Sequence, residues 1–221
     1  MMPILVVVPS LGRPQNATAF IDHWSRTTSG KSDLLFVLED NDPTADKYPK
    51  VPGVWYLVGN YRSLGNAFNA AFEAYPDYEF YAPLNDDHWV RTVGWEDTVI
   101  AALADGGIAY GNDGFQGERL ATAPVLDGDL VRELGYIAPP GIAHLYIDDA
   151  WMHIGREVGH LTYLSDVLFE HMHPEANKGV WDDTYRAANA PEAYARDHGS
   201  YMDWLTNRAE QDIIRARQSV A

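Results

Sequence analysis

The sequence predicts an α/β fold in which a mostly parallel central sheet is flanked by helices. Short apolar runs rich in β-branched residues alternate with stretches that carry apolar residues at helical spacing. The first run, Ile4 to Val8, contains no polar residue, which is typical of a strand covered on both faces. This alternation favours parallel strands joined by helical crossovers.

Three more strands are expected in the first 84 residues, each a short apolar run bounded by turn-forming or acidic residues. They cover residues 34–38, 54–58 and 79–84. Helices are expected where apolar residues recur at intervals of three and four. They cover residues 17–24, 64–75 and 95–103. Asn16 is available to cap the first of these helices.

The second half of the chain is less regular. Residues 107–126 are rich in glycine and are expected to form strands separated by turns. A short helix, a second helical face, a last strand and a final helix follow. They cover residues 127–136, 151–158, 160–171 and 204–217. We expect residues 1–185 to form one domain, with residues 186–221 as a helical C-terminal extension packed on it.

Composition limits the possible functions. The 221 residues include 16 Lys and Arg against 32 Asp and Glu, which gives a net charge of −16. Such a charge disfavours binding to nucleic-acid duplexes, because that affinity depends on neutralising phosphates with cationic side chains. The chain has no cysteine, which excludes disulfides, thiolate zinc sites and cysteine nucleophiles. No stretch approaches the roughly 18 apolar residues of a membrane span, so we expect a cytoplasmic protein.

Acidic and imidazole side chains gather where strands are expected to end. Asp86 and Asp87 follow the strand at 79–84, and His171 and His173 follow the last strand. Ligands of open α/β sheets bind outside the carboxyl ends of the strands. Because Mg²⁺ and Mn²⁺ take carboxylate oxygens and leave positions for phosphate, we expect Asp87 and one of the histidines to bind such an ion. The alternative is a solvated Asp-Asp turn and structural histidines.

A second acidic pair, Asp148 and Asp149, precedes an apolar helical face. One of the two can cap the helix, because Asp is favoured at an N-cap and in the first turn. The other is then free to act as a general base on an acceptor hydroxyl.

Several charged residues lie in the loops that follow the first three strands. Arg13 and Arg62 can meet phosphate charge, or they can be ordinary surface arginines. Asp40 and Asp42 can accept hydrogen bonds from a base or ribose, although Asp also forms turns without any such role.

Six short motifs resemble, in their order along the chain, the nucleotide-sugar glycosyltransferases of the GT-A fold. They are "VVVPSLGRP", the acidic loop after the second strand, "YRSLGNAFNAAF", "PLNDDHW", "YIDDAW" and "FEHMHP". The resemblance is to the family-two-like group and covers residues 3–185. The small size of the chain is similar to that of versions encoded by phages.

The resemblance implies roles for particular residues. It implies a nucleotide-sugar site that includes an Asp-X-Asp-like motif, in which Asn85 stands where the first acid is usual. The residues of this implied site are Pro9, Ser10, Arg13, Asp40, Asp42, Arg62, Asn66, Asn85 and Asp86. It also implies Asp87 and either His171 or His173 as metal ligands, and it favours Asp149, the second member of its pair, as the catalytic base over Asp148.

The reaction that the resemblance implies is transfer of a sugar from a UDP- or GDP-sugar to an acceptor hydroxyl. Mn²⁺ or Mg²⁺ would neutralise charge on the departing diphosphate while Asp149 takes the acceptor proton. Direct attack by the acceptor predicts inversion at the anomeric carbon. The acceptors left open are a protein, a glycan, a small metabolite and a hydroxymethylated base in phage DNA. A phage-encoded enzyme would act in the host cytoplasm.

Two other classes of protein stay open on sequence alone. Nucleotidyltransferases also bind nucleotides at the ends of parallel strands, but they usually carry a glycine-rich, basic loop after the first strand. The corresponding "PSLGRP" has one glycine and one arginine. A non-catalytic carbohydrate-binding or virion-associated module is the other class, because 7 Trp and 13 Tyr offer aromatic faces to a sugar.

Overall fold

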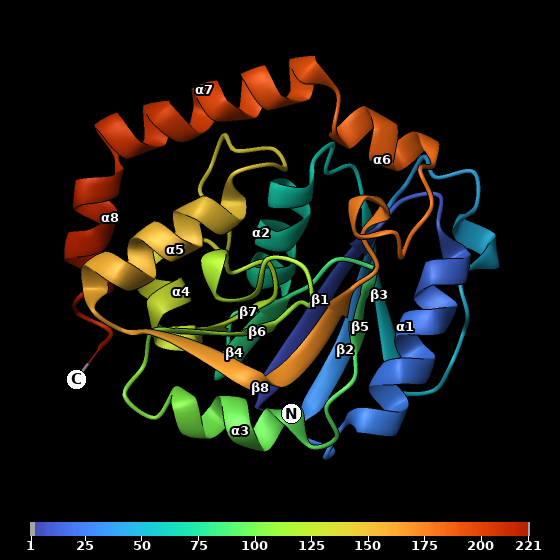
Figure 1. The fold of residues 1–221 in the computed structure, drawn as a ribbon, viewed down its shortest axis with the longest axis horizontal. Coiled ribbons are helices and arrows are strands. Elements are labelled where there is room, and N and C mark those ends of the chain that lie inside the picture. Colours follow the sequence, from blue (N-terminus) through green and yellow to red (C-terminus); the bar gives the residue numbers. More distant parts are fainter. Residues whose placement is uncertain (1–2, 221) are drawn as a thin grey trace.

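A computed structural model describes residues 3–220 and contains an eight-stranded sheet with helices packed on both faces (Figure 1). The strands are β1 (Ile4–Ser10), β2 (Ser32–Glu39), β3 (Val54–Gly59), β4 (Phe80–Pro83), β5 (His88–Val90), β6 (Ile108–Asn112), β7 (Pro124–Asp127) and β8 (Leu161–His171). Their order across the sheet is β3-β2-β1-β4-β7-β6-β8-β5. Four of the seven pairings are parallel, and β7 and β5 run antiparallel to their neighbours. The predicted fold class is confirmed.

The helices alternate with the strands in the first half of the chain and cluster at its end. They are α1 (Pro14–Thr27), α2 (Leu64–Ala74), α3 (Trp95–Ala102), α4 (Gly128–Leu134), α5 (Ile147–Val158), α6 (Asp183–Ala188), α7 (Pro191–Asn207) and α8 (Ala209–Ala216). Three single 3₁₀ turns lie in the loops, at Ala45–Lys47, Gly117–Arg119 and Pro174–Ala176. Among residues 3–220, none of these helices is both long and apolar enough to cross a membrane.

Alternate side chains of the parallel strands enter two separate cores. Along β1, Ile4, Val6 and Val8 pack with α1 and α3 on one face of the sheet. Leu5 and Val7 point to the other face, where α2, α4, α5 and α8 lie. Side chains alternate along a strand, so a strand buried on both faces needs apolar residues at every position. This is the physical reason for the unbroken apolar run at the start of the chain.

Two expectations about helices are wrong. Asn16 does not cap α1, because the helix begins at Pro14 with Arg13 at its N-cap, and the Asn16 side chain donates to Asp86 instead (3.2 Å). The helix expected over residues 204–217 is interrupted at Arg208. α8 leaves the end of α7 at a steep angle (Figure 1), and the Trp204 indole N–H donates to the buried Asp212 carboxylate (2.8 Å).

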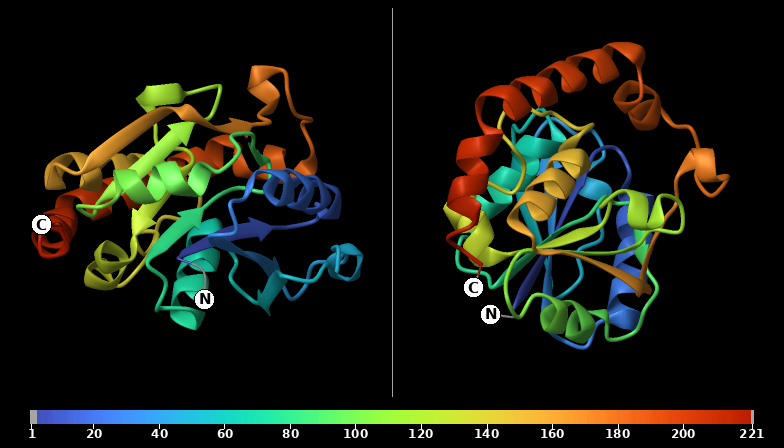
Figure 2. Two further views of the ribbon diagram at one scale, coloured as in Figure 1. Left: turned by 90° about the horizontal axis from the view of Figure 1, so that it is seen from below. Right: turned by 60° about the vertical axis from the view of Figure 1, so that its left-hand side comes forward.

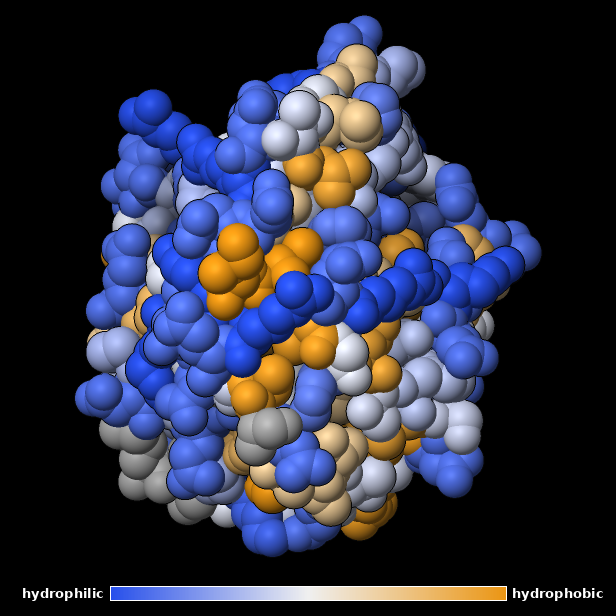
Figure 3. Space-filling view, turned by 90° about the vertical axis from the view of Figure 1, so that its left-hand side faces the viewer, coloured by the Kyte–Doolittle hydropathy of each residue, from blue (hydrophilic) through white to orange (hydrophobic). Residues whose placement is uncertain are grey.

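The C-terminal helices α6, α7 and α8 arch around one side of the molecule, from the carboxyl ends of the parallel strands to α4 and α5 (Figures 1 and 2). The expected domain boundary at residue 185 lies inside α6. The side that carries α8 is largely hydrophilic, with apolar side chains gathered near its middle (Figure 3). The exposed large hydrophobic residues of α7 and α8 are Tyr194, Met202 and Ile214.

Gly65, in the first turn of α2, lies against the loop that leads to α5. Its N–H donates to the Ala143 carbonyl (3.0 Å), and a Cβ at this position would lie 2.4 Å from the Ile142 carbonyl oxygen. We expect Gly65→Ala to lower the free energy of unfolding by about 1–3 kcal/mol, because backbone must move to make room. Urea denaturation measures this change.

Gly199 in α7 provides the matched control. A Cβ there would meet no atom within 4 Å. Since glycine weakens a helix interior, Gly199→Ala is expected to raise the free energy of unfolding by about 0.5–1 kcal/mol. Equal stability of the two variants would contradict the role given to Gly65.

Candidate active site

A cavity of about 1150 Å³ opens at the carboxyl ends of β1, β2, β3 and β4. Its wall also includes the first turn of α5, the end of β8 and α6. Most residues predicted from the sequence belong to this wall. They are Pro9, Ser10, Arg13, Arg62, Asn85, Asp86, Asp87, Asp148, Asp149, His171 and His173. The parallel strands therefore bring together the loops that the sequence pointed to.

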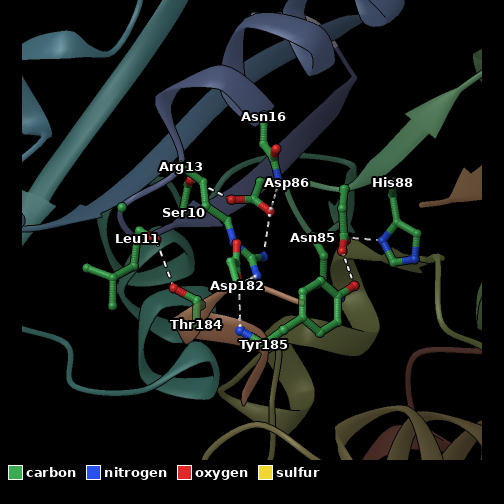
Figure 4. Close-up of polar contacts among 12 residues, drawn as sticks. Ser10, Leu11, Arg13, Asn16, Asn85, Asp86, His88, Asp182, Thr184 and Tyr185 are labelled. Atoms are coloured by element: carbon green, nitrogen blue, oxygen red, sulfur yellow. Dashed lines mark hydrogen bonds and ion pairs between the residues drawn. The ribbon is translucent and has the colours of Figure 1, made fainter. Parts of the chain in front are cut away.

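Asp86 is buried and points toward the loop after β1 (Figure 4). Its carboxylate accepts hydrogen bonds from the Ser10 hydroxyl (2.6 Å), the Asn16 amide (3.2 Å) and Arg13 Nη1 (3.3 Å). Burial and the adjacent Asp87 charge raise the pKa of Asp86 to about 6, although Arg13 and the hydrogen bonds oppose this shift. Asp86 therefore ties the β1 loop and α1 to the end of β4.

Asp87 is also buried but points the other way, toward β8. The Tyr185 hydroxyl donates to its Oδ2, and His171 Nε2 lies 3.5 Å from its Oδ1. Oδ1 itself is buried without a hydrogen-bond partner. Burial disfavours the ionised form, but the nearby His171, with His88 and the Tyr185 hydroxyl, holds the pKa of Asp87 well below its ordinary value.

The pairing of β5 with β8 brings Asp87 to His171. The two strands are antiparallel, and His88 lies opposite His171. The Met172 N–H donates to the Asp87 carbonyl (2.9 Å), which fixes the backbone on both sides of the pair. Burial and the neighbouring His171 lower the pKa of His88 to about 3, so His88 is neutral, and its Nδ1 accepts the Asn85 N–H (3.1 Å). The turn that carries the two acids is thereby held closed.

The side chains at this point suit a hard divalent cation. Among residues 3–220, no three His, Asp or Glu side chains come close enough to hold a metal by themselves. Asp87 Oδ1 and His171 Nε2, however, face each other at 3.5 Å, and the oxygen lacks another partner. Mg²⁺ is usually bound by one or two carboxylates, with water and substrate phosphate completing its shell. The pair fits that arrangement.

His173 occupies a different position from His171. Its ring lies 4.9 Å from the His171 ring and stacks on Phe115 at 5.1 Å. Its Nδ1 accepts the Glu175 N–H (3.1 Å). Burial and the neighbouring His171 lower its pKa. His171 is thus the histidine that contacts Asp87, and His173 supports the ring of His171.

The acidic pair Asp148 and Asp149 lies within the first turn of α5 and not before it. Neither acid is the N-cap, which is Tyr146 with a left-handed backbone (φ 69°), but both occupy the first turn, where negative charge was expected to be favourable. The Asp149 N–H donates to Asp148 Oδ1 (3.1 Å). Burial and the Asp149 charge raise the pKa of Asp148 to about 7. Burial also raises the pKa of Asp149.

Three predicted residues lie off the cavity wall, and two of them, Asp42 and Asn66, hold its loops in shape. Asp42 accepts the Gly12 N–H (2.8 Å), and the Asn66 amide donates to the Tyr61 carbonyl (2.8 Å). Asp40 is exposed. A direct contact of these three with a nucleotide stays a prediction.

Sequence reasoning missed Tyr185, which belongs to the wall, and Asp182, which pairs with Arg13; both lie in the segment before α7. Arg13 donates from Nε and Nη2 to Asp182 (2.7 and 2.6 Å), and its guanidinium lies 4.6 Å from the centre of the Tyr185 ring. Asp182 in turn caps α6. The cap pattern of Asp182 was visible in the sequence, but nothing there relates it to Arg13. Glu39, which accepts the Tyr61 and Arg62 N–H groups (3.1 and 2.7 Å), was also missed.

No protein-family model matches the chain, and no curated protein sequence matches it. Solved structures do match. The mannosyltransferase PcManGT from Pyrobaculum calidifontis, in complex with GDP-Man and Mn²⁺, superposes with a TM-score of 0.59 at 12% identity, over 98% of this chain and 73% of the other.

Residues 1–349 of TarS from S. aureus give a similar result in two complexes. With UDP, the TM-score is 0.60 at 12% identity, over 97% of this chain and 81% of TarS. With UDP-GlcNAc, the TM-score is 0.59 at 13% identity, over 100% of this chain and 82% of TarS. The chain shares the fold of nucleotide-sugar glycosyltransferases. The expectation drawn from the six motifs is confirmed at the level of the fold.

Arg13 is the only cation within hydrogen-bonding distance of Asp86 in the described part of the chain. Arg13→Gln is expected to lower the free energy of unfolding at pH 7 by about 2–4 kcal/mol, because it leaves a buried carboxylate without its ion pair. Arg26→Gln is the matched control, since Arg26 pairs with Asp22 on the exposed surface of α1 and contributes under about 0.5 kcal/mol. Chemical denaturation that found the two variants equally stable would refute this account of Arg13.

Proposed function

We propose that the protein is a metal-dependent glycosyltransferase that moves a sugar from a nucleoside diphosphate sugar to an acceptor hydroxyl, with inversion. The meeting of Asp87 and His171 at 3.5 Å is the observation that carries the proposal. It occurs in the wall of a cavity at the carboxyl ends of the parallel strands. Proteins of the same fold are known with GDP-Man and Mn²⁺ and with UDP-GlcNAc.

The donor would lie along β1, β2 and β3. Ser10 and Arg13 after β1, Glu39 after β2, and Arg62 after β3 belong to this part of the wall. Arg62 is exposed and makes one side-chain hydrogen bond, from Nε to Asn60 Oδ1 (2.9 Å), whereas Arg13 is held by Asp86 and Asp182. Arginine suits this role because its planar guanidinium binds phosphate oxygens in pairs.

Asp87 and His171 would hold Mn²⁺ or Mg²⁺. The ion, when bound, supplies positive charge that stabilises the leaving diphosphate. Asp87 is already ionised at neutral pH, since its pKa lies below the ordinary value, and it can serve as a ligand without losing a proton. Because Oδ1 has no hydrogen-bond partner, Asp87 could bind the ion while the Tyr185 hydroxyl keeps its hydrogen bond to Oδ2.

Asp148 fits the role of general base better than Asp149. A base is most effective when its pKa lies near the working pH, and the pKa of Asp148 is raised to about 7. The acceptor O–H proton passes to the Asp148 carboxylate, the oxygen bonds to the anomeric carbon, and the bond from that carbon to the diphosphate oxygen breaks on the opposite face. This assignment departs from the resemblance, which favours Asp149.

Metal binding is testable without knowing the sugar. MnCl₂ together with UDP or GDP should raise the melting temperature of the wild type, because a ligand that binds only the folded state stabilises it. Asp87→Asn and His171→Gln are expected to lose the Mn²⁺-dependent part of this shift. His160→Gln, which lies outside the cavity wall, should keep it. An undiminished shift in Asp87→Asn would remove the metal assignment.

The base assignment predicts both a mutant effect and a pH profile. Asp148→Asn should reduce transfer by about 10²–10⁴-fold, whereas Asp149→Asn should lose much less. Because the base must be deprotonated, kcat/KM of the wild type should rise with pH through about 7 and level off above it. Loss of transfer in Asp149→Asn alone would return the role to Asp149.

The stability of Asp148→Asn separates this effect from misfolding. A raised pKa means that ionising Asp148 destabilises the folded state, so wild-type stability falls as the pH rises from about 4 to 7. The neutral amide avoids this loss. Asp148→Asn should therefore have an equal or higher melting temperature at pH 8, and a lower one would mean that its loss of transfer reflects a damaged fold.

A further inference from the structure

The cavity is larger than one ligand needs, and its two halves differ in chemistry. Its volume of about 1150 Å³ exceeds the roughly 300–1,000 Å³ of pockets for a single small ligand. One half is formed by the loops after β1, β2 and β3, with Arg13 and Arg62. The other half is formed by the loop between β6 and β7, the first turn of α5 and part of α7. This second half has room for the acceptor.

The loop between β6 and β7 is held in one shape by a buried carboxylate. Asp113 is 1% exposed, and one of its oxygens accepts the N–H groups of Phe115, Gln116 and Gly117 at 2.7–2.9 Å. Its other oxygen accepts the Thr122 hydroxyl (2.8 Å). These four hydrogen bonds hold the pKa of Asp113 below its ordinary value, despite burial. The side chains at the tip of the loop are thus presented in a fixed position.

Phe115 is presented at the edge of the candidate metal site. Its ring is partly exposed and stacks on His173, with centres 5.1 Å apart and planes 13° apart. The His173 ring meets the His171 ring edge-on at 4.9 Å. The wall thus runs from an aromatic ring through His173 to His171, which contacts Asp87. A molecule that packs on Phe115 lies beside the place of reaction.

The charges of this half exclude a strongly anionic acceptor. Asp148, Asp149 and Glu175 belong to its wall, and Arg196 is the only Lys or Arg there among residues 3–220. The Arg196 guanidinium already pairs with Asp197 (2.7 Å). A nucleic acid or a phosphate-linked polymer would meet uncompensated carboxylates, whereas its binding depends on cations. Carboxylates can instead accept hydrogen bonds from hydroxyl groups, and the Gln116 amide can both accept such bonds and donate them.

From this geometry we infer that the acceptor is a neutral saccharide that packs one face on the Phe115 ring. The inference rests on the proposed glycosyl transfer and specifies its acceptor. A sugar has an apolar C–H face that matches an aromatic ring, and hydroxyls around its edge that match the acidic wall. Phe115 is in this view a residue that determines acceptor specificity.

The test compares acceptors after a productive donor has been found by its hydrolysis in the presence of Mn²⁺. The acceptors are neutral oligosaccharides, an oligodeoxynucleotide with hydroxymethylcytosine, a poly(ribitol phosphate) and a neutral Ser/Thr peptide. We expect transfer to oligosaccharides only. Transfer to any of the other three in preference to oligosaccharides would overturn the inference while leaving the proposed function intact. Absence of both donor hydrolysis and nucleotide binding would overturn the two together.

Variants of Phe115 give the second part of the test. Phe115→Ala is expected to raise the KM for the oligosaccharide by about tenfold, the effect of losing an aromatic contact of about 1.4 kcal/mol. Phe115→Tyr keeps the ring and should restore the KM to within about twofold. Trp55→Ala, which removes an aromatic residue outside the cavity wall, is the control and should leave this KM unchanged. An unchanged acceptor KM in Phe115→Ala would refute the stacking role.

Discussion

The site depends on the burial of two adjacent carboxylates at the end of β4. Asp86 and Asp87 are 4% and 5% exposed. Burying an ionised carboxylate costs several kcal/mol unless charges and hydrogen bonds compensate it. Compensation comes from four separate parts of the chain: the loop after β1, the start of α1, the end of β8, and α6. These parts are held around the same turn because each provides a partner for one of its two acids.

The pair also divides structural and chemical roles between neighbours. Successive side chains of an extended segment point in opposite directions. Asp86 therefore faces the β1 loop, where three donors satisfy it, and Asp87 faces the β5–β8 pair, where one oxygen keeps no partner. A fully satisfied carboxylate can position a loop, and an incompletely satisfied one can bind a cation. The same division recurs at Asp113, whose four hydrogen bonds shape a loop, and Asp148, whose burial raises its pKa.

Local patterns predicted the elements that have a periodic signal. The apolar runs at 34–38 and 54–58 lie within β2 and β3, and the helical stretch at 64–75 matches α2 within one residue. The three-residue strand β5 has no such signal, because it is short and begins with a histidine. The break at Arg208 could not be predicted from the sequence either, because it depends on the contact of Trp204 with Asp212 in the folded core.

The amino-acid sequence by itself determined the α/β class, the positions of the parallel strands and the two acidic pairs, because hydrophobic periodicity and strand-end composition are local properties. Only the tertiary structure decided which histidine contacts Asp87, which carboxylate has its pKa raised to about 7, and that Asp182 pairs with Arg13 while Tyr185 donates to Asp87. These features depend on distances between residues far apart in the chain and on exclusion of water. These distances are set, and water is excluded, only after the chain has folded.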